Sequence, residues 1–204
     1  MSAIFAEELH VAYEHGRRDF RHWDLAGADL RGIAIPGASL YGANLRGADL
    51  RDSNLTDVDL RTAEMQKADL SHANLQNARL AGANLENANL EGATLVECDL
   101  RMANLEEADL AGANLRGASL PDAALIGADL EGADLTDADL SHADLEQADL
   151  REANLRCAAL RQADLRCADF GGANMVDVQI QGANLHDVDL AGTCLERRRG
   201  AVRS

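Results

Sequence analysis

The sequence has very few aromatic residues, which make up only 3% of its 204 positions. That share excludes the aromatic-rich core of an ordinary globular domain, so burial has to come from stacked aliphatic side chains. The sequence also has no apolar run long enough to cross a bilayer, and its first residues lack the pattern of a signal peptide. We therefore expect a cytoplasmic protein that does not engage membranes.

Patterns that carry chemistry are equally scarce. No CxxC pair, Walker motif or GxGxxG run occurs, and the six histidines are scattered along the chain. The four cysteines, which are Cys98, Cys157, Cys167 and Cys194, predict free thiols in a reducing compartment. Because no nucleophile, base and orienting residue converge, the sequence predicts no enzyme, no cofactor and no metal site.

The chain does contain a pattern that repeats every five residues. Residues 127–150 read GADLEGADLTDADLSHADLEQADL, with Leu at every fifth position and Ala two positions before it. The same phase runs from Phe20 to Leu195 and makes 36 units. Side-chain directions repeat about every 3.6 residues along a helix and every two residues along a strand, so a period of five indicates a compound unit. It predicts a short extended segment that points Ala and Leu inward, followed by an outward corner, with units stacked into a solenoid.

The residue before each Leu indicates how many units complete one coil. Every twentieth position gives a nearly uniform series, namely Asp29, Asp49, Asp69, Asn89, Asp109, Asp129, Asp149, Asp169 and Asp189. The series offset by ten residues is mixed and begins Asp19, Ser39, Asp59, Arg79. A twenty-residue coil with four faces explains the difference. It predicts about nine coils, stacked about 4.8 Å apart in a rod roughly 43 Å long.

The A(D/N)LXX pattern of residues 18–197 resembles the pentapeptide-repeat protein family. This resemblance implies the fold class, an all-β solenoid built as a right-handed quadrilateral β-helix. The four-sided section and the handedness come partly from the resemblance, whereas the coil length comes from the residues. The functions associated with the family are few.

The two ends of the chain depart from the five-residue period. Residues 1–16 predict a short N-terminal capping helix, with Ser2 at its start, Gly16 at its end, and one face formed by Phe5, Leu9, Ala12 and Tyr13. The β-helix is expected over residues 17–197, followed by a basic tail over residues 198–204. No helix covers the last coil, so either the tail or a second copy covers it. We expect a homodimer whose candidate contact residues are Leu185, Leu190 and Leu195.

Charge is the main functional signal of the sequence, which carries a formal net charge of −16. Between positions 86 and 149 only Arg101 and Arg116 oppose sixteen acidic residues, which are Glu86, Glu91, Glu97, Asp99, Glu106, Glu107, Asp109, Asp122, Asp129, Glu131, Asp134, Asp137, Asp139, Asp144, Glu146 and Asp149. The candidate partner-binding acidic face comprises Asp109, Asp129, Glu131, Asp134, Asp149 and Asp169. Such an acidic trunk repels phosphates, so direct nucleic-acid binding is not expected.

The ladder of aspartates has two interpretations. If Asp109, Asp129, Asp149, Asp169 and Asp189 stack about 5 Å apart, their mutual repulsion raises the carboxyl pKa values in the folded state. Alternatively, each carboxylate accepts a backbone N–H and holds its corner.

The sequence also predicts ion pairs between neighbouring coils. Arg151 is expected to pair with Glu131, and Arg166 with Glu146, because the members of each pair are one coil apart.

Two functions are compatible with these features. The first is a non-catalytic acidic rod that serves as a protein–protein interaction module or scaffold, with a partner that the sequence does not identify. The second, implied by resemblance to the quinolone-resistance members of the family, is a DNA mimic. Such a rod binds a type II topoisomerase, DNA gyrase, and inhibits it or protects it from inhibitors. The uninterrupted coils and the lack of a C-terminal helix depart from those members, so we favour the interaction module.

Overall fold

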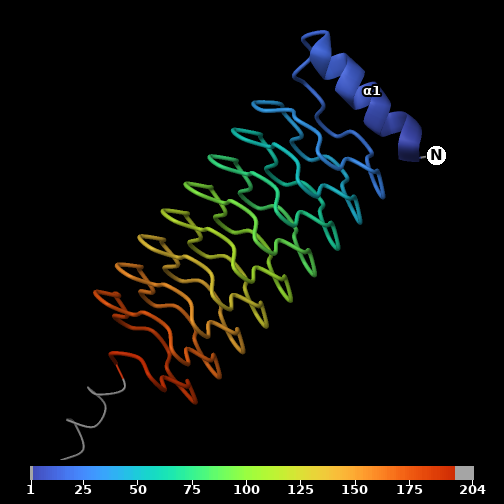
Figure 1. Cartoon of the computed structure of the whole chain (residues 1–204). Helices are drawn as coiled ribbons and strands as arrows, with labels where there is room; N and C mark the ends of the chain where they lie inside the picture. The colour runs from blue at the N-terminus through green and yellow to red at the C-terminus, as the bar shows by residue number, and fades with distance from the viewer. Residues whose placement is uncertain (1, 196–204) are drawn as a thin grey trace, which may run out of the picture.

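The computed structural model describes residues 2–195, with side chains from residue 7 onward. One helix, α1 (Ser2–Glu14), lies at the N-terminal end of a rod of stacked coils (Figure 1). No helix in this described part of the chain is long and apolar enough to span a bilayer. The predicted helix is therefore present. The expected contacts of Ser2 and Phe5 and the basic tail 198–204 lie outside the described residues and side chains.

The helix α1 ends as its sequence predicts and packs on the first coils. Gly16 has a φ of +91°, a left-handed conformation typical of the residue that ends a helix. The Leu9 side chain is completely buried in the core, and the half-buried Tyr13 packs against it. The Tyr13 hydroxyl also donates a hydrogen bond of 2.8 Å to the carbonyl of Pro36. These contacts tie α1 to the open edge of the solenoid.

Each coil contains twenty residues, as the sequence predicts. Parallel bridges join residues twenty apart along the rod, from Asp19 and Ser39 at one end to Asp169 and Asp189 at the other. The extended segments are short, as the sequence predicts, and in the described chain only the residue before each Leu position forms a bridge. A five-residue unit has no room for a longer strand, because three of its five residues form the corner and the exit from it.

A single hydrogen-bond scheme repeats at the corners and between coils. In one example the N–H of Leu50 donates to the carbonyl of Asp69 in the next coil at 2.7 Å. The N–H of Ser53 donates back to the Leu50 carbonyl at 3.2 Å and closes a turn. Asp52, the third residue of this turn, has a φ of +58°, as in a type II turn. The five-residue period thus follows from one turn and one bridge on each side of the coil.

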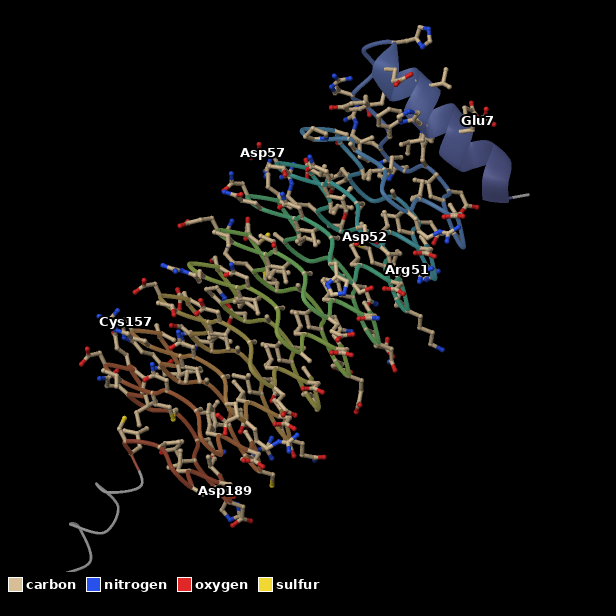
Figure 2. All side chains as sticks on the ribbon, viewed as in Figure 1. Glu7, Arg51, Asp52, Asp57, Cys157 and Asp189 are labelled. Atoms are coloured by element: carbon tan, nitrogen blue, oxygen red, sulfur yellow. The ribbon has the colours of Figure 1, made fainter. Side chains whose placement is uncertain are left out.

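The core is a set of aliphatic columns. The inward Ala and Leu residues of the trunk are at most 2% exposed between Ala63 and Phe170, as the sequence predicts. Figure 2 shows these side chains filling the inside of the coils, while others project from the corners. Ser53 occupies an inward position normally held by Ala, and its hydroxyl is buried without a hydrogen-bond partner. Burial comes from stacking, which explains how the fold needs so few aromatic residues.

The C-terminal end is less covered than the trunk. Leu190 is buried, but Leu185 and Leu195 are half-buried, and so are Val178 and Ile180. In contrast, the Leu side chains in the middle of the rod are essentially inaccessible. The candidate dimer residues therefore lie together at an incompletely covered end. The dimer itself stays a prediction.

Candidate functional site

The coil places its outward residues on four faces. Each face is defined by a ladder of bridge residues and the corner after it. Face I carries the ladder Asp24 to Asn184, face II Asp29 to Asp189, face III Ala34 to Asn174, and face IV Asp19 to Gln179. Face II lies between faces I and III and opposite face IV. In Figure 2, Arg51 and Asp189 of face II lie along one side of the rod, and Asp57 and Cys157 along the other.

The acidic residues are unequally distributed over these faces. Ten of the sixteen that lie between positions 86 and 149 belong to faces I and II, namely Glu86, Glu91, Glu106, Glu107, Asp109, Asp129, Glu131, Asp144, Glu146 and Asp149. Faces I and II carry no Lys or Arg between Lys67 and Arg151. The other six acidic residues share faces III and IV with Arg101 and Arg116. We call the ten residues the acidic surface.

Most of the acidic surface has no counter-charge. Three of its members, Glu131, Glu146 and Asp149, form ion pairs with arginines of the next coil or corner. The other seven have no ion pair within residues 2–195. Their corners bring Glu86, Glu106 and Asp129 to half-exposed or exposed positions. The acidic surface therefore presents unpaired carboxylates to solvent on both faces.

The ladder aspartates of face II stack in register, as the sequence predicts. Bridges join Asp109 to Asp129, Asp129 to Asp149 and Asp149 to Asp169. Each carboxylate also accepts a hydrogen bond from the backbone N–H two residues later. The distances are 3.0 Å for Asp109, 2.9 Å for Asp129, 3.0 Å for Asp149 and 2.8 Å for Asp169. The interpretation that these side chains hold the corners is therefore confirmed.

The expectation that stacking raises the pKa values is wrong at Asp149. The Arg151 guanidinium donates to its carboxylate at 2.8 Å and lowers the pKa of Asp149 below its usual range. The same arrangement recurs near the N-terminus of face II, where Arg31 lowers the pKa of Asp29 to about 2. An arginine two residues after the aspartate outweighs repulsion from ladder neighbours because its contact is direct and bidentate.

Arg151 also decides the chemistry of the densest carboxylate cluster. Oxygens of Asp129, Glu131 and Asp149 lie within 4.8 Å of one another, a spacing that could hold a cation. Arg151 already pairs with Glu131 at 2.7 Å and with Asp149 at 2.5 Å. This pairing and that of Arg166 with Glu146 at 2.5 Å confirm the predicted contacts between coils. Arg151 thus offsets one of the three negative charges, and the cluster keeps a net charge of −2.

Asp134 does not lie with the other candidate residues. It belongs to the ladder of face III, where it bridges Asn114 and Asn154. Its Oδ1 accepts hydrogen bonds from the backbone N–H of Thr136 at 3.1 Å and from the side-chain amide of Asn154 at 3.2 Å. Asp109, Asp129, Glu131, Asp149 and Asp169 are brought together on face II, but Asp134 is turned away around the next corner.

Face I also contributes to the acidic surface, although the predicted candidate residues include none from it. Glu86, Glu106 and Glu146 occupy the same corner in successive coils, with Ile126 between the last two. Their positions differ by multiples of twenty, so sorting the acidic residues by place in the coil would have grouped them. That signal was available in the sequence.

The cysteines are all free, as expected. Cys98 is buried in an inward position, and burial raises the pKa of its thiol to about 12. Cys157 and Cys167 lie at corners of opposite faces, after face III and face I respectively. Neither position brings a thiol into the acidic surface.

Comparison with known proteins gives a consistent picture. A family profile for pentapeptide repeats matches residues 24–61, 63–101, 98–137, 133–170 and 163–197. The crystal structure of HetL, a pentapeptide repeat protein involved in heterocyst differentiation regulation in the cyanobacterium Nostoc sp. strain PCC 7120, is 33% identical with a TM-score of 0.66. The match covers 92% of this chain and 95% of HetL.

A second solved structure is more distant. Trypsin-treated QnrB1, a plasmid-mediated fluoroquinolone resistance protein, is 18% identical with a TM-score of 0.49, over 90% of this chain and 96% of that chain. No curated protein sequence matches the chain. The profile match and the likeness to HetL indicate that the coils form a right-handed quadrilateral β-helix.

Proposed function

The chain belongs to the pentapeptide-repeat family, and from this premise we propose that it is a non-catalytic interaction rod. It consists of about nine coils, with α1 covering the N-terminal end, and it binds a protein partner through the acidic surface of faces I and II. The partner carries a basic groove or patch, because complementary charge steers association and selects the partner.

One observation carries this proposal. Faces I and II have no Lys or Arg between Lys67 and Arg151, although the corners of the repeat accept arginine readily elsewhere. Arg31 and Arg51 neutralise their ladder aspartates on the same face II. The fold therefore permits neutralisation, and its absence at the other seven residues of the acidic surface leaves a field that favours a cationic partner.

Similarity to HetL supports a regulatory role for such an interaction. HetL is involved in heterocyst differentiation regulation and is 33% identical over 92% of the chain. A rod without a catalytic constellation regulates by occupying the surface of another protein. We therefore place this protein among binding partners that modulate another protein's activity.

The test compares two charge variants with equal net charge. The first carries Glu86→Gln, Glu106→Gln, Glu107→Gln and Asp129→Asn in the acidic surface. The matched control carries Glu97→Gln, Asp122→Asn, Asp137→Asn and Asp139→Asn on faces III and IV. Both change the net charge by the same amount and leave the inward residues untouched. Affinity capture from the source cell, with quantification of each retained protein, provides the readout.

We expect the partner to be retained by the wild type and by the control, and to be lost from the acidic-surface variant. Equal loss from both variants would show that net charge alone governs capture, and the assignment to faces I and II would fall. Equal retention by both would remove charge from the recognition altogether. Circular dichroism melts of all three proteins establish that they are comparably folded.

The alternative function is a DNA mimic that binds DNA gyrase and inhibits it or protects it from inhibitors. The density of charge favours it. The seven unpaired carboxylates of the acidic surface span about three coils, or one per ~2 Å of axis at the usual ~4.8 Å spacing, and B-DNA carries one charge per about 1.7 Å. Titration of gyrase supercoiling with both charge variants distinguishes the two functions. Inhibition or protection by the wild type and control, but not by the acidic-surface variant, selects the mimic.

The proposed rod forms a homodimer through its C-terminal coils. Leu185 and Leu195 are half-buried at an end where the trunk would bury them fully. Pairing of like ends about a two-fold axis covers this apolar surface. Light scattering of the full chain is expected to give twice the monomer mass, and a strict monomer at high concentration would reject the dimer.

A further inference from the structure

A groove with a different charge lies on face IV, opposite the face II part of the acidic surface. It has a volume of about 490 Å³ and is lined by Arg18, Asp19, Arg21, Gly37, Ser39, Tyr41, Asp59 and Arg61. The lining carries three arginines and two aspartates, in a chain whose overall net charge is −16. We call it the face IV groove.

The groove arises because one coil departs from its neighbours. Asp19, Ser39 and Asp59 are successive ladder residues. Arg21 and Arg61 follow the two aspartates at the corner, whereas Tyr41 takes that place after Ser39. Ser39 is shorter than an aspartate, and Gly37 in the preceding corner has no side chain. The middle coil is therefore recessed between two coils that each carry an Asp–Arg pair.

The two Asp–Arg pairs orient their guanidinium groups through two hydrogen bonds each. Arg21 donates to Asp19 from Nε at 2.9 Å and from Nη2 at 2.6 Å. Arg61 donates to Asp59 in the same way at 2.8 and 2.7 Å. The Arg21 side chain lowers the pKa of Asp19 to about 2, so that this pair stays formed at neutral pH. Within the described residues neither Nη1 is used in a hydrogen bond.

The remaining polar groups of the groove are also donors. Arg18 stacks on the Tyr13 ring, 3.7 Å from its centroid, and donates from Nη1 to the Tyr13 carbonyl at 2.8 Å. Within the described structure the Arg18 Nη2 makes no hydrogen bond, so it can donate to a bound ligand. Ser39 and Tyr41 also line the groove, and no hydrogen bond of the described chain engages either hydroxyl. The groove thus offers unused donors around the recessed middle coil.

We infer that the face IV groove binds an acidic segment of a protein partner, with one Asp or Glu carboxylate seated between Arg18, Ser39 and Arg61. Its net charge of one positive unit matches a single carboxylate, which neutralises it. A phosphate dianion would leave excess negative charge next to Asp19 and Asp59. The volume exceeds that of one side chain, so neighbouring peptide residues fit as well.

This binding site is separate from the acidic surface. Face IV lies across the rod from face II, and the two surfaces attract partners of opposite charge. The rod would then hold an acidic segment on one side while the acidic surface engages a basic partner on the other. Failure of either assignment leaves the other intact, because their tests use different variants and different probes.

The repeat supplies a matched pair of substitutions for the test. Ser39→Asp places a carboxylate in the floor of the groove. Ser119→Asp makes the same change on the same ladder, since Ser119 lies between Asp99 and Asp139 as Ser39 lies between Asp19 and Asp59. Aspartate is common on this ladder, so both variants are expected to fold. Only the first adds charge to the groove.

The probes are two blocked peptides, Gly-Ser-Glu-Ser-Gly and its glutamine counterpart, titrated into the full chain by NMR. We expect saturable shifts of the amides of Gly37, Ser39 and Tyr41 with the glutamate peptide, weakened by salt and absent with the glutamine peptide. Ser39→Asp should weaken binding about tenfold, since a like charge then lies about 5 Å away. Ser119→Asp should stay within about twofold of wild type.

Three results would overturn the inference. The first is a wild type that shows no saturable shifts at millimolar peptide. The second is equal binding by Ser39→Asp and the wild type, or equal binding of the two peptides. The third is stronger competition by inorganic phosphate than by acetate, which would replace the single carboxylate with a phosphate group.

Discussion

Asp129→Asn separates the two roles of a ladder aspartate, which are charge and hydrogen-bond acceptance. The Asp129 carboxylate accepts the backbone N–H of Glu131 at 2.9 Å and lies in register with Asp109 and Asp149. Asparagine keeps the Oδ1 acceptor and removes the charge. Alanine removes both, so the pair of substitutions resolves the contributions.

The magnitudes follow from the ladder spacing. Two carboxylates about 4.8 Å apart in water-like surroundings repel by about 0.9 kcal/mol. Asp129 has two such neighbours, but the Arg151 pair with Asp149 offsets most of one of them. We therefore expect Asp129→Asn to raise the free energy of unfolding by about 0.5–1 kcal/mol at neutral pH. Asp129→Ala forfeits a hydrogen bond of about 0.5–1.5 kcal/mol and should unfold about 1 kcal/mol more easily than the asparagine variant.

Urea and thermal unfolding near neutral pH, at low and at high salt, provide the measurement. The advantage of asparagine over aspartate should shrink with salt, because salt screens exposed charges. Asp49→Asn is the control on the same face, where Arg51 pairs with Asp49 at 2.6 Å, and there the substitution should destabilise. An Asp129→Asn protein that unfolds more easily than wild type, or a gain that survives high salt, would refute the repulsion.

Three further predictions follow from the ends, the core and the paired aspartates. Removal of residues 1–16 exposes the first coil and deletes Leu9, whose burial contributes about 1.5–3 kcal/mol. We expect the truncated protein to melt at a lower temperature and to aggregate. An unchanged melting temperature would show that α1 is dispensable. Ser53→Ala replaces a buried hydroxyl without a partner by the usual residue of that position and should raise the free energy of unfolding by about 1 kcal/mol in urea titrations. Asp29, whose pKa Arg31 lowers to about 2, should stabilise the rod above about pH 4 and lose that effect as the pH falls toward 2. Melts of Asp29→Asn and wild type should therefore converge with acidification, and a constant difference would contradict the pairing.

The sequence predicted the coil because its constraints are geometric. Inward Ala and Leu at a fixed spacing leave one way to bury both, and the Asp series at twenty-residue intervals reveals the coil length. The short extended segment was predicted as well, because three residues of each unit are needed for the corner. The hydrogen bonds from ladder carboxylates to the corner were foreseen only as an alternative, because side-chain acceptance depends on the path of the backbone.

The candidate site was harder to predict than the fold. Asp134 was assigned to the acidic face with Asp129, although five residues separate one face from the next. The pKa of Asp149 was expected to rise from ladder neighbours, but Arg151 at the same corner lowers it. The groove of face IV escaped notice because its residues come from three coils and only their stacking brings them together.

Charge in this rod is largely independent of the requirements of folding. A ladder position does not require a charge, since Asp129 and Asn104 accept the corner N–H equally, at 2.9 and 3.0 Å, and Ala124 also forms the bridges of its ladder. The corner residues tolerate acidic, basic or neutral side chains without changing the bridge pattern. Stability therefore does not dictate where carboxylates gather, and repulsion between them opposes their gathering. A run of unpaired carboxylates on two adjacent faces carries a cost that the fold does not require, and binding of a basic partner gives a reason for it to persist.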